Sequence, residues 1–118
     1  MPTTLKLCTA VAVALTVLLA PSAQAKGCSP SQSPGAYGPT YTTELSVQGV
    51  SCSDGKGLIR KWDRCRRRNG GKDGKCRRPG HSFRCSEHRF NVISTQYDSR
   101  VSCRRGGDRV KFRYTQFT

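Results

Sequence analysis

The side chains of this sequence best suited to acid–base chemistry are two histidines and a glutamate: His81, His88 and Glu87. Cleavage of RNA by a small ribonuclease needs a general base and a general acid around a phosphate that cations hold in place. Glu87 and His88 are adjacent in an expected strand, where successive side chains leave on opposite faces. His81 lies in an expected loop. The three residues are therefore the candidate site of a small extracellular ribonuclease, but their positions favour a protein without catalytic activity.

A set of six cysteines is the second group of reactive side chains. They are Cys28, Cys52, Cys65, Cys76, Cys85 and Cys103. The segments between them hold 23, 12, 10, 8 and 17 residues, so no C-x₂-C pair typical of zinc sites is present. We therefore expect three disulfides and no bound metal or other cofactor. Six cysteines permit 15 connectivities, and their spacing alone leaves all of them open.

The N-terminal stretch is typical of a secretory signal peptide. Met1–Lys6 carries one positive charge, Leu7–Ala20 is mostly apolar, and Ala23-Gln24-Ala25 is a small-residue cleavage motif. About fourteen apolar residues are too few to span a membrane as a helix, which takes ~20. We predict a signal peptide over residues 1–25, whose removal would also remove Cys8. The mature protein would have no transmembrane segment and would be secreted, as an extracellular or cell-wall-associated protein in an oxidising compartment.

The charge of the chain is strongly positive. Its 21 Lys and Arg residues face 7 Asp and Glu residues, and loss of Lys6 with the signal peptide would leave a net charge of +13. The densest segment, Lys56–Arg78, holds eleven positive residues and only two acidic ones. Such a field attracts anionic partners by electrostatics. A cell-wall polymer, phospholipid head groups and nucleic acid all fit, and no sequence-specific nucleic-acid motif is present.

One helix is predicted, over residues 54–68. Ser51-x-x-Asp54 has the form of a capping box, with Asp in place of Glu. Leu58 and Trp62, one turn apart, fall on the same face, and Asn69-Gly70-Gly71 stops the helix. Before the helix, residues 26–43 are rich in Pro, Ser and Gly and predict an irregular arm to a disulfide-stabilised domain over residues 44–118. Residues 72–80 predict a surface loop.

Strand signals dominate the rest of the domain. A short strand is expected near 45–50, and longer ones over 82–93, 99–105 and 108–117, the last two joined by a tight Gly106-Gly107 turn. If Arg105 faces Asp108, Cys103 and Val101 lie on a buried face. The opposite face then pairs Arg104 with Arg109, Ser102 with Lys111, and Arg100 with Arg113. Like charges in facing positions destabilise a sheet. Either salt screens this face, or a polyanion neutralises it, and both explanations remain open.

The fold class expected is α+β, with one helix packed on a small antiparallel sheet of about four strands. The apolar residues available for its core are few, chiefly Leu45, Val47, Val50, Leu58, Ile59, Trp62, Phe83, Phe90, Val92, Ile93, Val101, Val110, Phe112 and Tyr114. A core of this size supplies only a few kcal/mol. Each disulfide typically adds ~2–4 kcal/mol, so we expect reduction to unfold the domain.

The function favoured by these observations is binding of an anionic extracellular polymer. The candidate binding residues are the cations of the helix and of the polar sheet face: Lys56, Arg60, Lys61, Arg64, Arg66, Arg67, Arg68, Arg100, Arg104, Arg109, Lys111 and Arg113. A secreted antimicrobial or toxin protein is an alternative, as is the ribonuclease. A membrane-active segment would show a large apolar helix face, whereas here the core needs those residues.

Several short runs together resemble a family of small secreted cysteine-containing basic proteins of actinobacteria. These runs are Val50-Ser51-Cys52, Lys61-Trp62 with Cys65, Ser82-Phe83-Arg84-Cys85, Val101-Ser102-Cys103-Arg104-Arg105-Gly106-Gly107 and Val110-Lys111-Phe112-Arg113-Tyr114. The resemblance covers about residues 47–114 and bears on fold and export only, because the family has no assigned activity. Cys28 and Cys76 are additions to its four-cysteine pattern, which implies that they pair with each other. For the remaining four we predict Cys52–Cys103 and Cys65–Cys85, which would join helix to sheet.

Overall fold

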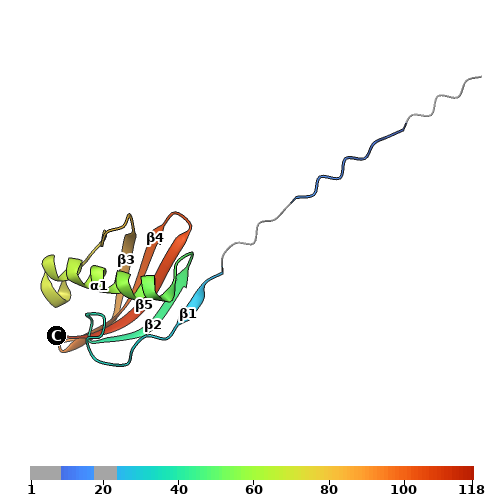
Figure 1. Cartoon of the computed structure of the whole chain (residues 1–118). Coiled ribbons are helices and arrows are strands. Elements are labelled where there is room, and N and C mark those ends of the chain that lie inside the picture. Colours follow the sequence, from blue (N-terminus) through green and yellow to red (C-terminus); the bar gives the residue numbers. More distant parts are fainter. Residues whose placement is uncertain (1–8, 18–23) are drawn as a thin grey trace, which may run out of the picture.

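A computed structural model of the chain describes residues 9–17 and 24–118 (Figure 1). The predicted signal peptide, Cys8 included, falls largely outside these ranges and remains a prediction. Residues 9–17, which belong to its apolar stretch, carry no regular secondary structure and are exposed. Within the described ranges, no helix has both the length and the apolar character needed to cross a membrane.

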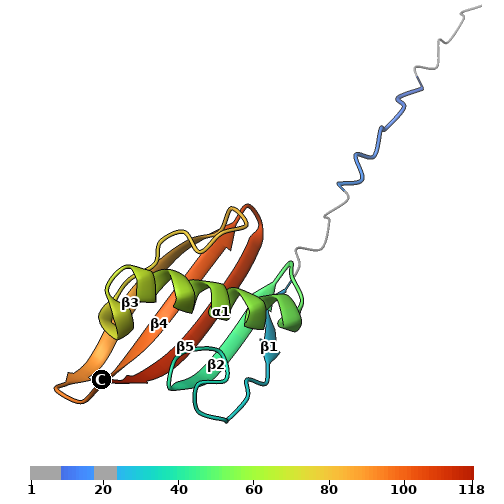
Figure 2. The same cartoon turned by 60° about the vertical axis from the view of Figure 1, so that its left-hand side comes forward.

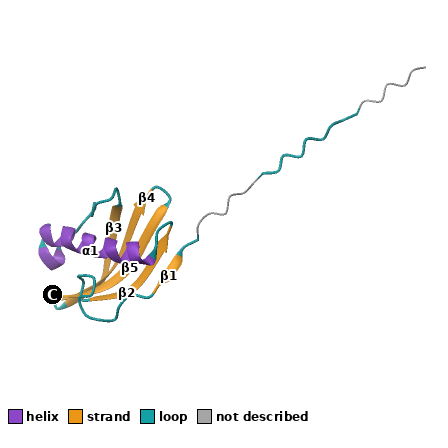
Figure 3. Ribbon diagram, in the orientation of Figure 1, coloured by secondary structure: helices purple, strands orange, loops and turns teal. Residues whose placement is uncertain are grey.

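The described domain is one helix laid across one face of a five-stranded antiparallel sheet (Figures 2 and 3). The elements run in the order β1 (Lys26–Cys28), β2 (Tyr41–Gln48), α1 (Cys52–Arg68), the short 3₁₀ helix η1 (Gly71–Asp73), β3 (Arg84–Ile93), β4 (Gln96–Arg105) and β5 (Asp108–Phe117). The strand order in the sheet is β1-β2-β5-β4-β3. The α+β class is therefore confirmed.

The sheet has five strands instead of about four because β1 adds an edge. Lys26–Cys28 lies in the segment expected to be irregular, yet it pairs antiparallel with the end of β2, Lys26 opposite Val47 and Cys28 opposite Leu45. Three residues without apolar alternation give no strand signal in the sequence. The strand β2 likewise starts at Tyr41, inside the same predicted arm.

The helix has the predicted capping box and begins two residues earlier than expected. The Ser51 hydroxyl accepts a hydrogen bond from the Asp54 backbone N–H, and the Asp54 carboxylate accepts one from the Ser51 N–H. Trp62 is fully buried and packs edge-on against Phe112 of β5, with ring centroids 5.1 Å apart. A Cβ atom added at Gly55 would lie 2.7 Å from the Val47 side chain, so this glycine lets the helix approach β2 closely.

The register predicted for the β4–β5 hairpin is confirmed at every pair. Arg105 faces Asp108, Cys103 faces Val110, and Val101 faces Phe112, with these last two pairs buried beneath the helix. Gly106, the first residue of the two-residue turn, has φ 56°, the left-handed value that such turns require.

Three residues expected in the core are not there. Val92 and Ile93 are the last two residues of β3 and are 66% and 60% exposed, while Phe90 leaves the sheet on the face away from the helix. The pairing of β3 with β4 is irregular between Phe90 and Ile93, where Asn91 adopts φ 50°, so the regular alternation of β3 is interrupted before Val92 and Ile93. Tyr37 and Tyr97 contribute to the core in their place.

All six cysteines form disulfides, as predicted, but each of the three predicted pairings is wrong. The bonds are Cys28–Cys52, Cys65–Cys76 and Cys85–Cys103. Strand β1 lies beside the end of β2 that leads into α1, which brings Cys28 to the first residue of the helix. Cys65 meets the loop that returns from the helix end, and Cys85 lies directly opposite Cys103 in the β3–β4 register. Among the described residues, no disulfide joins the helix to the core strands β4 and β5.

Candidate anion-binding face

The face of the sheet turned away from α1, called here the outer face, carries a groove with a volume of about 610 Å³. Because side chains alternate along a strand, the residues that leave on this face are every second one of β2, β5, β4 and β3. Those that line the groove are Glu44, Ser46, Ser86, His88, Arg100, Ser102, Lys111 and Arg113.

Strand register arranges these side chains in rows across the sheet. One row runs from β3 to β2 as His88, Arg100, Arg113 and Glu44, and the next as Ser86, Ser102, Lys111 and Ser46. A third row holds Arg84, Arg104, Arg109 and Gln48. Successive rows are two residues apart along the strands, roughly 6.8 Å. The six cations of these rows, the outer-face cluster, are Arg84, Arg100, Arg104, Arg109, Lys111 and Arg113.

Two carboxylates, Glu44 and Asp98, lie on the same face as the six cations of the outer-face cluster. Arg113 lies 3.9 Å from the Asp98 carboxylate, and over residues 24–118 the other five cations form no ion pair. Hydrogen bonds from Thr115 and Asn91, and then the charge of Arg113, lower the pKa of Asp98, so this carboxylate stays ionised. The face therefore has like charges opposite one another, and most of its cations have no carboxylate partner. This arrangement suits an anionic ligand with several charges.

Phe90 adds an aromatic side chain beside the groove. The guanidinium carbons of Arg100 and Arg113 lie 4.7 and 4.9 Å from the centre of its ring. The imidazole of His88, two residues earlier on the same face of β3, is nearly parallel to the Phe90 ring, with centroids 6.2 Å apart.

The helix cations lie on the other side of the molecule, since α1 covers the inner face (Figure 2). Arg60, Arg64 and Arg68 are exposed there, and Lys56 and Lys61 are half-buried. Arg67 is occupied by an ion pair with Asp63 (2.8 Å) and a hydrogen bond to the Gly38 carbonyl. Apart from Arg66, the predicted binding residues thus lie on two separate surfaces. The groove of about 610 Å³ is on the outer face.

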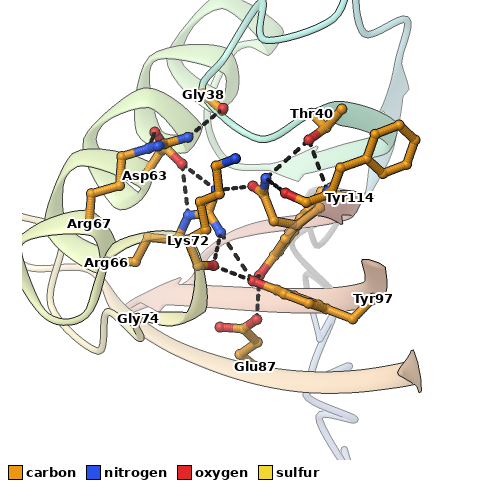
Figure 4. A network of polar contacts seen from close by, with 12 residues as sticks. Gly38, Thr40, Asp63, Arg66, Arg67, Lys72, Gly74, Glu87, Tyr97 and Tyr114 are labelled. Atoms are coloured by element: carbon orange, nitrogen blue, oxygen red, sulfur yellow. Dashed lines mark hydrogen bonds and ion pairs between the residues drawn. The ribbon is translucent and has the colours of Figure 1, made fainter. Parts of the chain in front are cut away.

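Arg66 does not belong to either surface, which corrects its assignment as a binding residue. Its side chain is fully buried between helix and sheet (Figure 4). Its guanidinium donates to Asp63 Oδ1 (2.7 Å), to Gln116 Oε1 (2.6 Å) and to the Lys72 carbonyl (2.8 Å), and lies over the rings of Trp62 and Tyr114. Each guanidinium nitrogen of Arg66 thus donates to an acceptor within the protein, and the side chain holds the end of the helix to β5.

The residues of the predicted ribonuclease site do not come together. Glu87 points to the inner face, where Tyr114, Ser99 and Arg89 donate hydrogen bonds to it. His88 leaves on the outer face, as strand alternation predicts. His81 lies in the loop before β3, against Lys61, beside a smaller hollow of about 300 Å³.

Glu87 is part of the buried polar network instead. Burial, followed by the hydrogen bond to Glu87, raises the pKa of Tyr114 far above its ordinary value, so the phenol stays protonated and donates. Tyr97 lies 3.5 Å from the Tyr114 hydroxyl and itself donates to the Lys72 carbonyl (Figure 4). Among the described residues, no cluster of three or more His, Cys, Asp or Glu side chains could hold a metal ion.

The sequence-based set of binding residues does not include Arg84, Glu44 and Phe90, which lie on the outer face. Strand alternation could have found two of them. Arg84 and Phe90 are an even number of residues from His88, so they leave on its face, whereas the buried Cys85 leaves on the other. Glu44 follows a break in the β2–β5 register between Thr42 and Glu44, which alternation alone could not reveal.

No protein-family model, curated protein or solved structure matches this chain. Conclusions about function therefore depend on the geometry of the outer face.

Proposed function

We propose that this protein binds an anionic extracellular polymer through the outer face of its sheet. The observation that supports this most directly is the outer-face cluster: six cations in three adjacent rows, five of them without an ion pair among residues 24–118. Facing like charges cost stability in the free protein, and a bound polyanion would remove that cost while gaining attraction to every row.

The rest of the fold allows this face to stay charged. The helix and the inner face provide the buried core, and three disulfides add ~2–4 kcal/mol each. The outer face can therefore tolerate repulsion that a more weakly stabilised sheet could not. Three disulfides are also typical of proteins from oxidising compartments, which supports an extracellular setting for the ligand.

The two alternative functions have less support. A ribonuclease that uses His81, Glu87 and His88 would need them in one cleft, and they lie in three different surroundings. A toxin that inserts its helix into membranes would need an apolar helix face, but Leu58, Ile59 and Trp62 are buried against the sheet.

The test is binding to inorganic polyphosphate over a salt series, with two triple variants of equal charge. The first, Arg100→Gln/Lys111→Gln/Arg113→Gln, removes three groove cations. The matched control, Arg60→Gln/Arg64→Gln/Arg68→Gln, removes three exposed helix cations. At about 1 kcal/mol per cation near an anionic surface, the groove variant should lose affinity on the order of a hundredfold, and the control clearly less.

Two results would contradict the proposal. Equal losses in both variants would mean that net charge alone, without the groove, attracts polyphosphate. Affinity that does not fall as salt rises would exclude an electrostatic interface altogether.

A further inference from the structure

Phe90 is an aromatic side chain that the core does not use. Trp62, Phe83, Tyr97, Phe112 and Tyr114 are all buried on the inner side of the sheet. Phe90, in contrast, leaves β3 on the outer face, in register with Asp98 and partly open to solvent. On this face Phe90 adds nothing to the small apolar core beneath the helix.

The ring of Phe90 is surrounded by groove residues. Arg100 and Arg113 both place their guanidinium groups within 5 Å of its centre, at 4.7 and 4.9 Å. His88 continues the aromatic surface with a ring tilted by only 11°. Two cations that line the groove thus lie against Phe90, whose ring is nearly parallel to that of His88.

Resting on the proposed function, we propose that the polymer is single-stranded nucleic acid. Its phosphates would lie in the groove along the outer-face cluster, and one base would stack on the platform formed by Phe90 and His88. Proteins that bind single strands without reading sequence combine a cationic groove with aromatic rings on which bases stack. Arginine guanidinium planes can extend such a stack, and Arg100 and Arg113 are placed to touch both parts of a nucleotide.

Other anionic polymers would contact the cations of this surface but would leave the Phe90 ring without a partner. Polyphosphate, a phosphate-linked wall polymer or a phospholipid head group has no planar ring to place on Phe90. A duplex keeps its bases paired and stacked within the helix, so their faces are not available. The outer face is therefore expected to prefer single strands over duplexes of the same sequence and over polyphosphate of equal charge.

The experiment compares a labelled twelve-nucleotide oligo-dT with polyphosphate, using the full mature protein and variants at Phe90. Phe90→Ala should weaken oligo-dT binding roughly tenfold and change polyphosphate binding by less than about twofold. Phe90→Leu, which keeps apolar volume without a ring, should give the same pattern, and Phe90→Trp should restore binding. Phe117→Ala, at an exposed aromatic that leaves β5 on the same face but lies outside the groove, is the matched control and should leave both affinities unchanged.

Other outcomes would contradict either the stacking of a base on Phe90 or the binding of polyanions as such. If Phe90→Ala and Phe90→Leu leave oligo-dT binding intact, or weaken both ligands equally, the stacking proposal is wrong while polyanion binding stands. If neither ligand binds, the proposed function itself fails. Tighter binding to phosphatidylglycerol vesicles that is lost in Val92→Ser/Ile93→Ser would assign the face to a lipid surface, reached through the exposed end of β3, and would overturn the nucleic-acid proposal.

Discussion

The two faces of the sheet use arginine in opposite ways. On the inner face, Arg66 is fully buried and each of its nitrogens meets an acceptor, while Arg89 pairs with Glu87 and donates to the Asp73 and Gly74 carbonyls. On the outer face, Arg104 opposes Arg109 and Arg100 opposes Arg113, and within residues 24–118 Asp98 is the one carboxylate that forms an ion pair with a member of the outer-face cluster.

This difference separates structural cations from cations available to a ligand. A buried guanidinium must be matched internally, because an unpaired charge away from water is very costly. An exposed one needs no partner, since solvent and salt screen it. Variants on the inner face should therefore change stability, and variants on the outer face should change binding, even though both carry the same residue type.

The largest expected effect is at Arg66. Arg66→Met should lower the free energy of unfolding by about 3 kcal/mol, because the buried Asp63 would keep only its more exposed partner Arg67, and the buried Gln116 Oε1 would lose its donor. Urea denaturation with the disulfides intact would measure it. Arg67→Met is the matched control: it removes the more exposed cation from the same carboxylate, Asp63, and should cost less than about 1 kcal/mol. Equal losses would contradict the distinction between buried and exposed arginines.

The next effect concerns Tyr114, whose hydroxyl donates to Glu87. Tyr114→Phe should cost about 1–2 kcal/mol, the usual penalty for leaving a buried acceptor short of a donor. Because the pKa of Tyr114 is raised in the folded state, its contribution is full below the unfolded tyrosine pKa near ~10 and is lost as pH rises above it. Thermal unfolding between pH 9 and ~11 should therefore show a steeper loss of stability in the wild type than in Tyr114→Phe. Parallel curves would contradict this assignment.

Much of this two-faced arrangement could be predicted from the sequence. The Gly106-Gly107 turn and strand alternation define the β4–β5 register, and with it the facing arginines of the outer face. Helical periodicity could likewise have placed Arg66 in the interior. It follows Leu58 and Trp62 at intervals of four, on the buried side of the helix. Predicting it as a binding residue gave its charge more weight than its position.

The disulfides and the outer aromatic surface were harder to predict. Pairing of Cys28 with Cys52 depends on β1, a three-residue strand that leaves no pattern in the sequence. Pairing of Cys65 with Cys76 depends on how the chain turns after the helix. Phe90 was expected in the core because of its residue type, whereas its parity relative to Cys85 places it outside. Residue type predicts burial on average, but register decides it at a given position.

A smaller effect is expected at Asp98, the carboxylate that balances part of the outer face. Its pKa is lowered by hydrogen bonds from Thr115 and Asn91, so its contribution to stability is present above the unfolded aspartate pKa and is lost as pH falls through the folded one. Asp98→Asn should cost about 0.5–1 kcal/mol at neutral pH and flatten the loss of stability below pH ~4. Thermal unfolding from pH 7 to ~3 would show this. An unchanged acid limb would mean that other carboxylates dominate it.

The smallest expected effect is the one that joins stability to binding on the outer face. Arg104→Gln/Arg109→Gln removes a facing like-charge pair and should raise the free energy of unfolding by roughly 0.2–0.5 kcal/mol at low salt. The gain should shrink as salt rises, because screening already weakens the repulsion in the wild type. The same variant should bind polyphosphate more weakly, so stability and affinity would move in opposite directions. If instead the variant is less stable at low salt, the pair does not repel in the free protein, and the outer-face cluster carries no strain for a polyanion to relieve.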